Sequence, residues 1–195
     1  MPNLLFDSFN NPKDFVDSWS PKYFYSLEKK YDLNINNGLK DKNSFLELFL
    51  WKNGTGDKIS KNKMKVVDGF LNKFSILKEL QKKFDWSLFE KEFKPTESST
   101  IWKIFLLHII SPNELPIFDQ HVFRFYHFNL YGEINEMPLS NKKVYKIYKE
   151  EYLSWFNKIK KDFNLNPKKM DESFFTFGQF LKKIKNYPFK IITQP

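Results

Sequence analysis

The chain has 195 residues, of which 41% are hydrophobic and 19% aromatic, a composition that does not predict an intrinsically disordered protein. It has no cysteine, which excludes disulfides, a cysteine nucleophile and thiolate metal sites, and its three histidines lack metal-ligand spacing. The formal net charge of +9 favours a polyanionic partner, although lysine is abundant and alanine absent, as in proteins of biased composition.

The chain shows helix start signals followed by apolar residues at helical spacing, and no strand pattern. Asn11-Pro12 and Ser20-Pro21 each place an N-cap residue before a proline at the first helical position. We therefore predict an all-α fold of eight or nine helices, with one or two further turns at 85–93. The predicted helices span residues 11–19, 20–31, 44–52, 60–74, 76–84, 101–110, 119–131, 144–163 and 172–185.

Residues 101–110 are almost entirely apolar, which is typical of a helix buried on all sides. Pro112 and Pro116 end that helix, and Asp119 supplies a side-chain acceptor for the first turn of the next one. The sequence thus predicts a carboxylate at a corner between a core helix and a second helix.

The segment PIFDQHVFR, residues 116–124, resembles the approach to the catalytic aspartate in the helix-hairpin-helix DNA glycosylase superfamily. Residues 45–53, FLELFLWKN, are similar to the family's early helix that ends in a base-pair-wedging loop, and residues 171–182 to the closing helix of the 8-oxoguanine glycosylase branch. The resemblance covers residues 43–185. The family's glycine-rich hairpin would fall at residues 94–100, where this chain has no glycine.

The resemblance implies a DNA glycosylase-like fold and cleavage of an N-glycosidic bond in DNA whose target base is flipped out. Asp119 would be the catalytic carboxylate, and Lys103 the nearest lysine to the nucleophile of the bifunctional members. No cofactor or metal is expected. Contacts to nucleic acid are expected from Asn53, Gly54, Ser98, Ser99, Thr100, His121 and Arg124. A base pocket is expected from Trp51, Gln120, Phe177 and Gln179.

Each of these residues also has a simpler interpretation. Asp119 is a suitable N-cap whether or not it is catalytic, and Lys103 is one of many lysines that solvent would otherwise surround. Trp51 and Phe177 have the spacing of core residues, and His108 lies within the apolar helix. The competing function is a non-catalytic basic helical module that binds DNA or a protein.

We expect one helical unit over residues 1–195. A division into two lobes, 1–42 plus 132–195 and 43–131, with a cleft between them, remains open. No apolar run approaches the ~20 residues that span a bilayer, so a cytoplasmic protein without a membrane partner is expected. The sequence leaves open the base removed, a role in repair or in defence against foreign DNA, and the oligomeric state.

Overall fold

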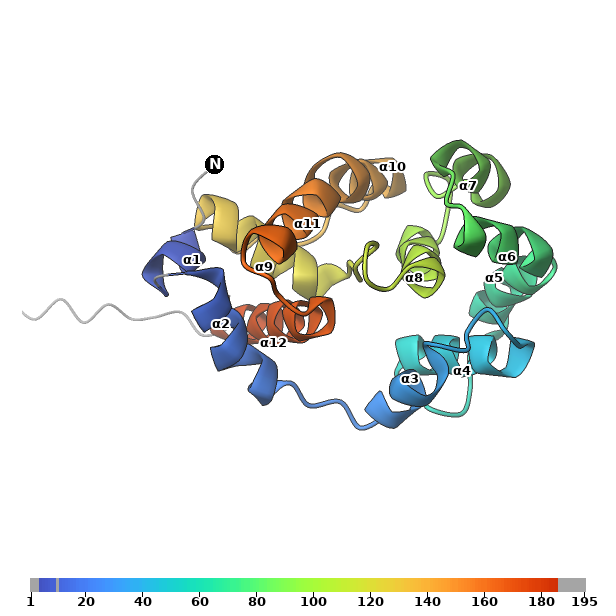
Figure 1. Cartoon of the computed structure of the whole chain (residues 1–195), viewed down its shortest axis with the longest axis horizontal. Helices are drawn as coiled ribbons and strands as arrows, with labels where there is room; N and C mark the ends of the chain where they lie inside the picture. Colours follow the sequence, from blue (N-terminus) through green and yellow to red (C-terminus); the bar gives the residue numbers. More distant parts are fainter. Residues whose placement is uncertain (1–3, 10, 186–195) are drawn as a thin grey trace, which may run out of the picture. The chain divides into compact units, whose positions relative to one another are not determined.

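The computed structural model of the chain describes residues 4–9 and 11–185, which form helices and turns and no β-strand (Figure 1). The all-α prediction is therefore confirmed. No helix in this part of the chain is both long enough and apolar enough to cross a bilayer. The elements are α1 (Leu4–Ser8), α2 (Pro12–Trp19), η1 (Ser20–Lys22), α3 (Glu28–Asn34), α4 (Lys42–Asn53), α5 (Lys61–Leu71), α6 (Phe74–Lys82), α7 (Trp86–Phe93), α8 (Thr100–Ile110), α9 (Gln120–Tyr131), α10 (Asn141–Lys146), η2 (Ile147–Tyr152), α11 (Leu153–Asp162) and α12 (Pro167–Lys185).

Side-chain caps start several of these helices. Asn11, Asp41 and Asp85 precede α2, α4 and α7, and each accepts a hydrogen bond from the backbone N–H three residues later, at 2.9, 2.7 and 3.0 Å. These bonds satisfy donors that have no partner within the helix itself. At the other end of α4, Gly54 takes a left-handed conformation with φ of 78°, which glycine adopts without steric cost.

Several helix boundaries differ from the prediction, and α1 is not among the predicted helices. Residues 20–31 form the single turn η1, an extended link and then α3, and the Tyr25 hydroxyl of the link donates to the Trp51 carbonyl at 2.7 Å. The last helix begins at Pro167 rather than Glu172. Asn166 caps it through the Lys169 N–H at 3.1 Å, and Asp171 is buried within it.

The predicted long helix over residues 144–163 is also modified. Helical structure runs without a break from α10 to α11, but residues Ile147–Tyr152 form a π-helical segment, η2. This insertion shifts the register between the apolar residues before it and those after it. Tyr148 and Tyr152 within it are completely buried.

The chain divides into two compact units, each built from separate segments. Unit 1 contains Met1–Tyr23, Phe118–Pro138 and Ser154–Pro195, and unit 2 contains Phe24–Ile117 and Leu139–Leu153. These units differ from the two lobes left open above, because residues 24–42 and 139–153 fall in unit 2 and residues 118–131 in unit 1.

In unit 1, helix α12 packs against both α9 and α2 (Figure 1). The contact is aromatic: the rings of Phe125 and Phe174 stack with centroids 4.2 Å apart, and Phe15 stacks on Phe125 at 5.2 Å. All three side chains are fully buried. This core fixes α9, and with it the residue that begins α9, against α12.

In unit 2, α8 is the buried helix that the sequence predicts: every side chain from Lys103 to Ile110 is buried. Within it, His108 is 2% exposed, and both ring nitrogens have partners. Its Nδ1–H donates to the Leu115 carbonyl at 3.0 Å, and its Nε2 accepts from the Tyr31 hydroxyl at 2.7 Å. His108 is thus a hydrogen-bonded core residue, and burial lowers its pKa to about 4.

Candidate functional site

Asp119 is the N-cap of α9, as the sequence predicts. Its backbone is extended, and its Oδ1 accepts hydrogen bonds from the backbone N–H of His121 at 2.9 Å and of Val122 at 3.2 Å. The side chain is half-buried, while its neighbour Gln120 is exposed. Two N–H donors and the positive end of the helix dipole favour the ionised carboxylate at this position.

The first turn of α9 lies unusually close to α12. A Cβ added to Gly178 would meet the carbonyl oxygen of His121 at 1.9 Å, so only glycine allows this approach. The rings of His121 and Phe175 also form a T-shaped contact, with centroids 4.9 Å apart. Burial lowers the pKa of His121, with Asp119 raising it and Arg124 lowering it to a smaller extent.

Arg124, expected to contact nucleic acid, is instead 1% exposed. Its guanidinium binds both carboxylate oxygens of Glu136 at 2.7 to 3.1 Å, and its Nη1 donates to the Nδ1 of His121 at 2.9 Å. These bonds lower the pKa of Glu136. Helical spacing alone does not predict the pairing of Arg124 with Glu136, because Glu136 comes from the loop after α9.

The four residues expected to form a base pocket are divided between the units, with Trp51 in unit 2 and Gln120, Phe177 and Gln179 in unit 1. Trp51 belongs to unit 2, where it packs on Tyr31 with ring centroids 4.9 Å apart and is 7% exposed. In unit 1, Phe177 is buried and forms a T-shaped contact with Trp19, at a centroid distance of 4.7 Å, and Gln179 is exposed. Trp51 and Phe177 therefore serve as core residues.

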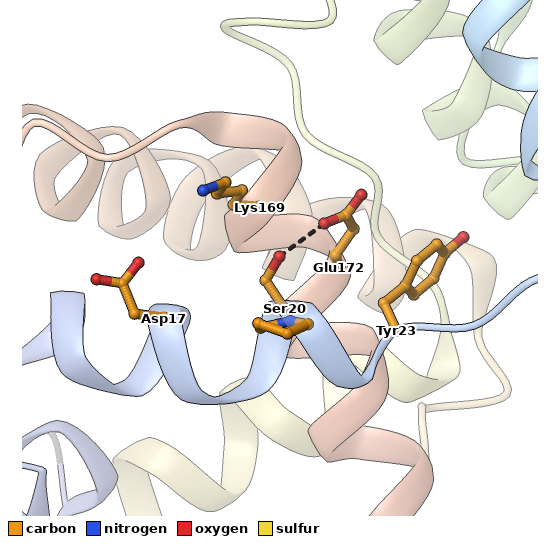
Figure 2. Close-up of a pocket in the computed structure, with 6 residues that line it drawn as sticks. Asp17, Ser20, Tyr23, Lys169 and Glu172 are labelled. Carbon is orange, nitrogen blue, oxygen red and sulfur yellow. Dashed lines mark hydrogen bonds between the residues drawn. The ribbon is translucent and has the colours of Figure 1, made fainter.

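A cavity of about 370 Å³ is present elsewhere in unit 1 (Figure 2). It is polar: carboxylates and an ammonium group surround it, and the Ser20 hydroxyl donates to Glu172 at 2.7 Å. These residues come from α2, η1, the residue after η1 and α12. Ser20-Pro21 is predicted only as a helix start, and none of the predicted site residues is among them. Its lining is Asp17, Ser20, Pro21, Tyr23, Lys169 and Glu172.

In unit 2, the loop after α4 is held together by Asn53. The Asn53 amide donates to the Thr55 hydroxyl at 2.7 Å and the Lys58 carbonyl at 2.9 Å, and its oxygen accepts from Lys63 at 2.8 Å. The Lys63 ammonium also lies over the Trp102 ring of α8, 5.6 Å from its centroid. Lys63 thus links the expected wedge loop to the first turn of α8.

Helices α7 and α8 are joined by a tight turn in place of a glycine hairpin. Lys94 and Ser99, at its two ends, have left-handed backbones with φ of 44° and 52°. The Thr100 hydroxyl donates to the Pro95 carbonyl at 2.6 Å, whereas the Ser99 side chain makes no capping bond. Ser98 is exposed. Residues other than glycine therefore adopt the conformations that glycine favours.

This turn gives a direct prediction about its backbone. Ser99→Gly should raise the free energy of unfolding by up to about 1 kcal/mol, because it removes the steric cost of the left-handed conformation. Ser98→Gly, at a neighbouring exposed position whose φ is not positive, should lower it slightly. Urea unfolding of the two variants measures the difference. A Ser99→Gly variant less stable than Ser98→Gly would contradict the left-handed assignment.

Lys103 lies one turn into α8 and is 8% exposed. Its ammonium donates to the Lys94 carbonyl at 3.0 Å, so it is bound beneath the turn that joins α7 to α8. Burial lowers the pKa of Lys103; Glu97 opposes this change, while Lys73 and Lys94 reinforce it. A buried amine of lowered pKa is a better nucleophile than a solvated lysine.

Across the described residues there is no group of three or more His, Asp or Glu side chains arranged to hold a metal ion. A comparison with protein-family models, curated proteins and solved structures finds no match to this chain.

Proposed function

We propose that this protein binds DNA and excises a damaged or modified base, with Asp119 as the carboxylate that assists cleavage of the N-glycosidic bond. The observation that carries the proposal is the setting of Asp119: a half-buried carboxylate, oriented by two backbone N–H groups, within the motif Asp-x-His-Val. A carboxylate fixed in this way stabilises developing positive charge without having to reorganise during the reaction.

Two features of unit 2 support DNA as the partner. The turn before α8 presents Ser98 to solvent at the N-terminus of an 11-residue helix, where backbone N–H groups and the helix dipole favour a phosphate. The loop at Asn53, bridged to Trp102 by Lys63, is a second polar and cationic surface. The net charge of +9 favours binding of a polyanion in general.

The proposed reaction balances as a hydrolysis. The bond between C1′ and the base nitrogen breaks, and its electron pair leaves with the base. Asp119 stabilises the cationic sugar that remains and orients the water whose oxygen bonds to C1′. The water's proton is released and the base takes up a proton, so the products are the free base and an abasic sugar.

Lys103 provides a variant of this chemistry. If its amine attacked C1′ in place of water, a Schiff base would follow, and strand cleavage by β-elimination would be possible. The lowered pKa of Lys103 supports this role, while its hydrogen bond to Lys94 must break first. Trapping with borohydride distinguishes the two routes, because only the amine route yields a covalent protein–DNA adduct.

The test is incubation with a panel of DNA duplexes, each with one damaged or modified base, followed by hot alkali. We expect cleavage of at least one duplex, and Asp119→Asn should slow it at least about a hundredfold. The variant should remain folded, because asparagine caps a helix nearly as well as aspartate. The rate is measured in single turnover.

Asp85→Asn is the matched control, because Asp85 is also an N-cap that binds a first-turn N–H through its side chain. It should leave the rate unchanged. Equal loss of activity in both variants would show that capping, and not catalysis, explains the effect of Asp119→Asn.

The second candidate function is a non-catalytic helical module that binds DNA. It is favoured by the internal pairing of Arg124 with Glu136 and by the burial of Trp51 and Phe177 in the cores of the two units. Salt-sensitive binding of DNA without cleavage of any duplex in the panel would select this alternative.

A further inference from the structure

Arg124 is the only arginine in a chain whose other basic side chains are lysine and histidine. Its side chain is 2% exposed, and its main ionic partner, Glu136, is 51% exposed. An arginine that is kept inside the protein and paired with a surface carboxylate does not serve as a general surface charge. Its contacts indicate a role that the guanidinium of arginine can fill at this position and the ammonium of lysine cannot.

The guanidinium reaches two partners at once. The Nε and Nη2 atoms of the forked guanidinium donate to Glu136, while Nη1 donates to the Nδ1 of His121 at 2.9 Å. This bond requires that the His121 Nδ1 be unprotonated, so the ring is neutral with its proton on Nε2. A lysine has a single nitrogen and would not span both partners in fixed geometry.

His121 contacts both Arg124 and Asp119. Its ring is held by Arg124 within α9 and by Phe175 of α12, and its backbone carbonyl lies against Gly178. Its backbone N–H donates to the Asp119 Oδ1 at 2.9 Å. The side chain and the main chain of the same residue therefore connect the buried arginine to the carboxylate.

We propose that Arg124, anchored by Glu136, is a positioning residue that fixes His121 and thereby the first turn of α9 that orients the Asp119 carboxylate. The catalytic consequence rests on the proposed function, whereas the positioning itself is independent of any activity. Arg124 touches no substrate in this scheme, and its effect passes through His121.

The test uses Arg124→Lys, which keeps the charge and removes the fork, and Glu136→Gln, an exposed change that should leave the fold intact. Asp162→Asn is the control, because it removes an exposed carboxylate paired with Lys158 in the same unit. Hydrogen exchange is measured at the backbone N–H groups of His121 and Val122, with Leu130 in the same helix as the internal reference.

We expect exchange at His121 and Val122 to be about tenfold faster in Arg124→Lys and about threefold faster in Glu136→Gln, with Leu130 and the control unchanged. The long-range proton–nitrogen spectrum of the His121 ring should show one tautomer in the wild type and a mixture in Arg124→Lys. Unchanged exchange at both amides in both variants, or equal acceleration along the whole of α9, would overturn the proposal.

A kinetic measurement extends the test where base excision is observed. Arg124→Lys should lower the single-turnover rate with DNA affinity unchanged, because the residue acts on orientation and not on binding. Weaker DNA binding with an unchanged rate would overturn the positioning role. If no duplex is cleaved by the wild type, the proposed function fails while the exchange result still decides whether Arg124 fixes the turn.

Discussion

Gly178→Ala is expected to destabilise unit 1 by about 3 kcal/mol or more. The new Cβ would lie 1.9 Å from the carbonyl oxygen of His121 and 2.5 Å from its carbonyl carbon. Both are backbone atoms, so no side-chain rotation relieves the overlap, and α12 must move away from α9. That movement disrupts the stacked rings of Phe125 and Phe174. Urea unfolding followed by circular dichroism measures the loss.

Gly69→Ala is the matched control for this substitution. Gly69 lies within α5, is exposed, and an added Cβ there would have no other atom within 4 Å. Alanine is favoured over glycine in a helix by about 1 kcal/mol, so this variant should be more stable than the wild type. A Gly178→Ala variant within about 0.5 kcal/mol of the wild type would show that the two helices are not in close contact.

The second large effect is a loss of stability in acid caused by His108. Its pKa is about 4 in the folded protein, against an ordinary value of 6.5, because the buried ring resists protonation. The unfolded chain therefore binds a proton first as the pH falls. The stabilisation is complete above pH 6.5, declines as the pH falls towards 4, and amounts to about 3 kcal/mol for a difference of this size.

The measurement is the free energy of unfolding between pH 7 and pH 4 for the wild type and for His108→Gln. The variant should be less stable at pH 7, because Gln does not reproduce both hydrogen bonds of the ring, but its stability should fall less towards pH 4. The difference between the curves isolates His108 from the carboxylates that also titrate in acid. Parallel curves would contradict the role assigned to it.

The sequence predicted those parts of the fold that depend on local chemistry. Helix α2 begins at Asn11-Pro12, and α4 ends at Asn53, before Gly54 with its positive φ. The apolar run in α8 is buried, and Asp119 caps α9. These features are set by residues within a few positions of one another, so the pattern alone contains the information.

Two helix starts differ from the prediction for different reasons: one depends on a contact between distant residues, and the other on a local start signal that the prediction did not use. The link after η1 is extended where its Tyr25 hydroxyl binds the Trp51 carbonyl, and no local signal reports that partner. The predicted last helix starts at Glu172, whereas the observed one starts at Asn166-Pro167, a capping residue followed by proline. Asp171, directly before the predicted start, is buried within α12.

The sequence predicts which residues could form the candidate site. It does not predict the neighbours that several of these residues have in the structure. Spacing could not show that Arg124 would be neutralised by Glu136 from the following loop, nor that Gly178 would lie against His121. Trp51 and Phe177 have the chemistry of a base pocket, but packing places both in a core. Burial of this kind is a property of tertiary contacts and not of helical periodicity.

Unit 1 is assembled from three separate segments, and this determines when it can form during synthesis. The segments holding α2 and α9 leave the ribosome well before α12, which supplies Phe174 and Gly178. Until residue 178 has left the ribosome, the aromatic core of unit 1 is incomplete, and the first turn of α9 lacks its contact with α12. The orientation of Asp119 is therefore completed only after translation of α12, so a partly synthesised chain contains Asp119 before its carboxylate has a fixed orientation.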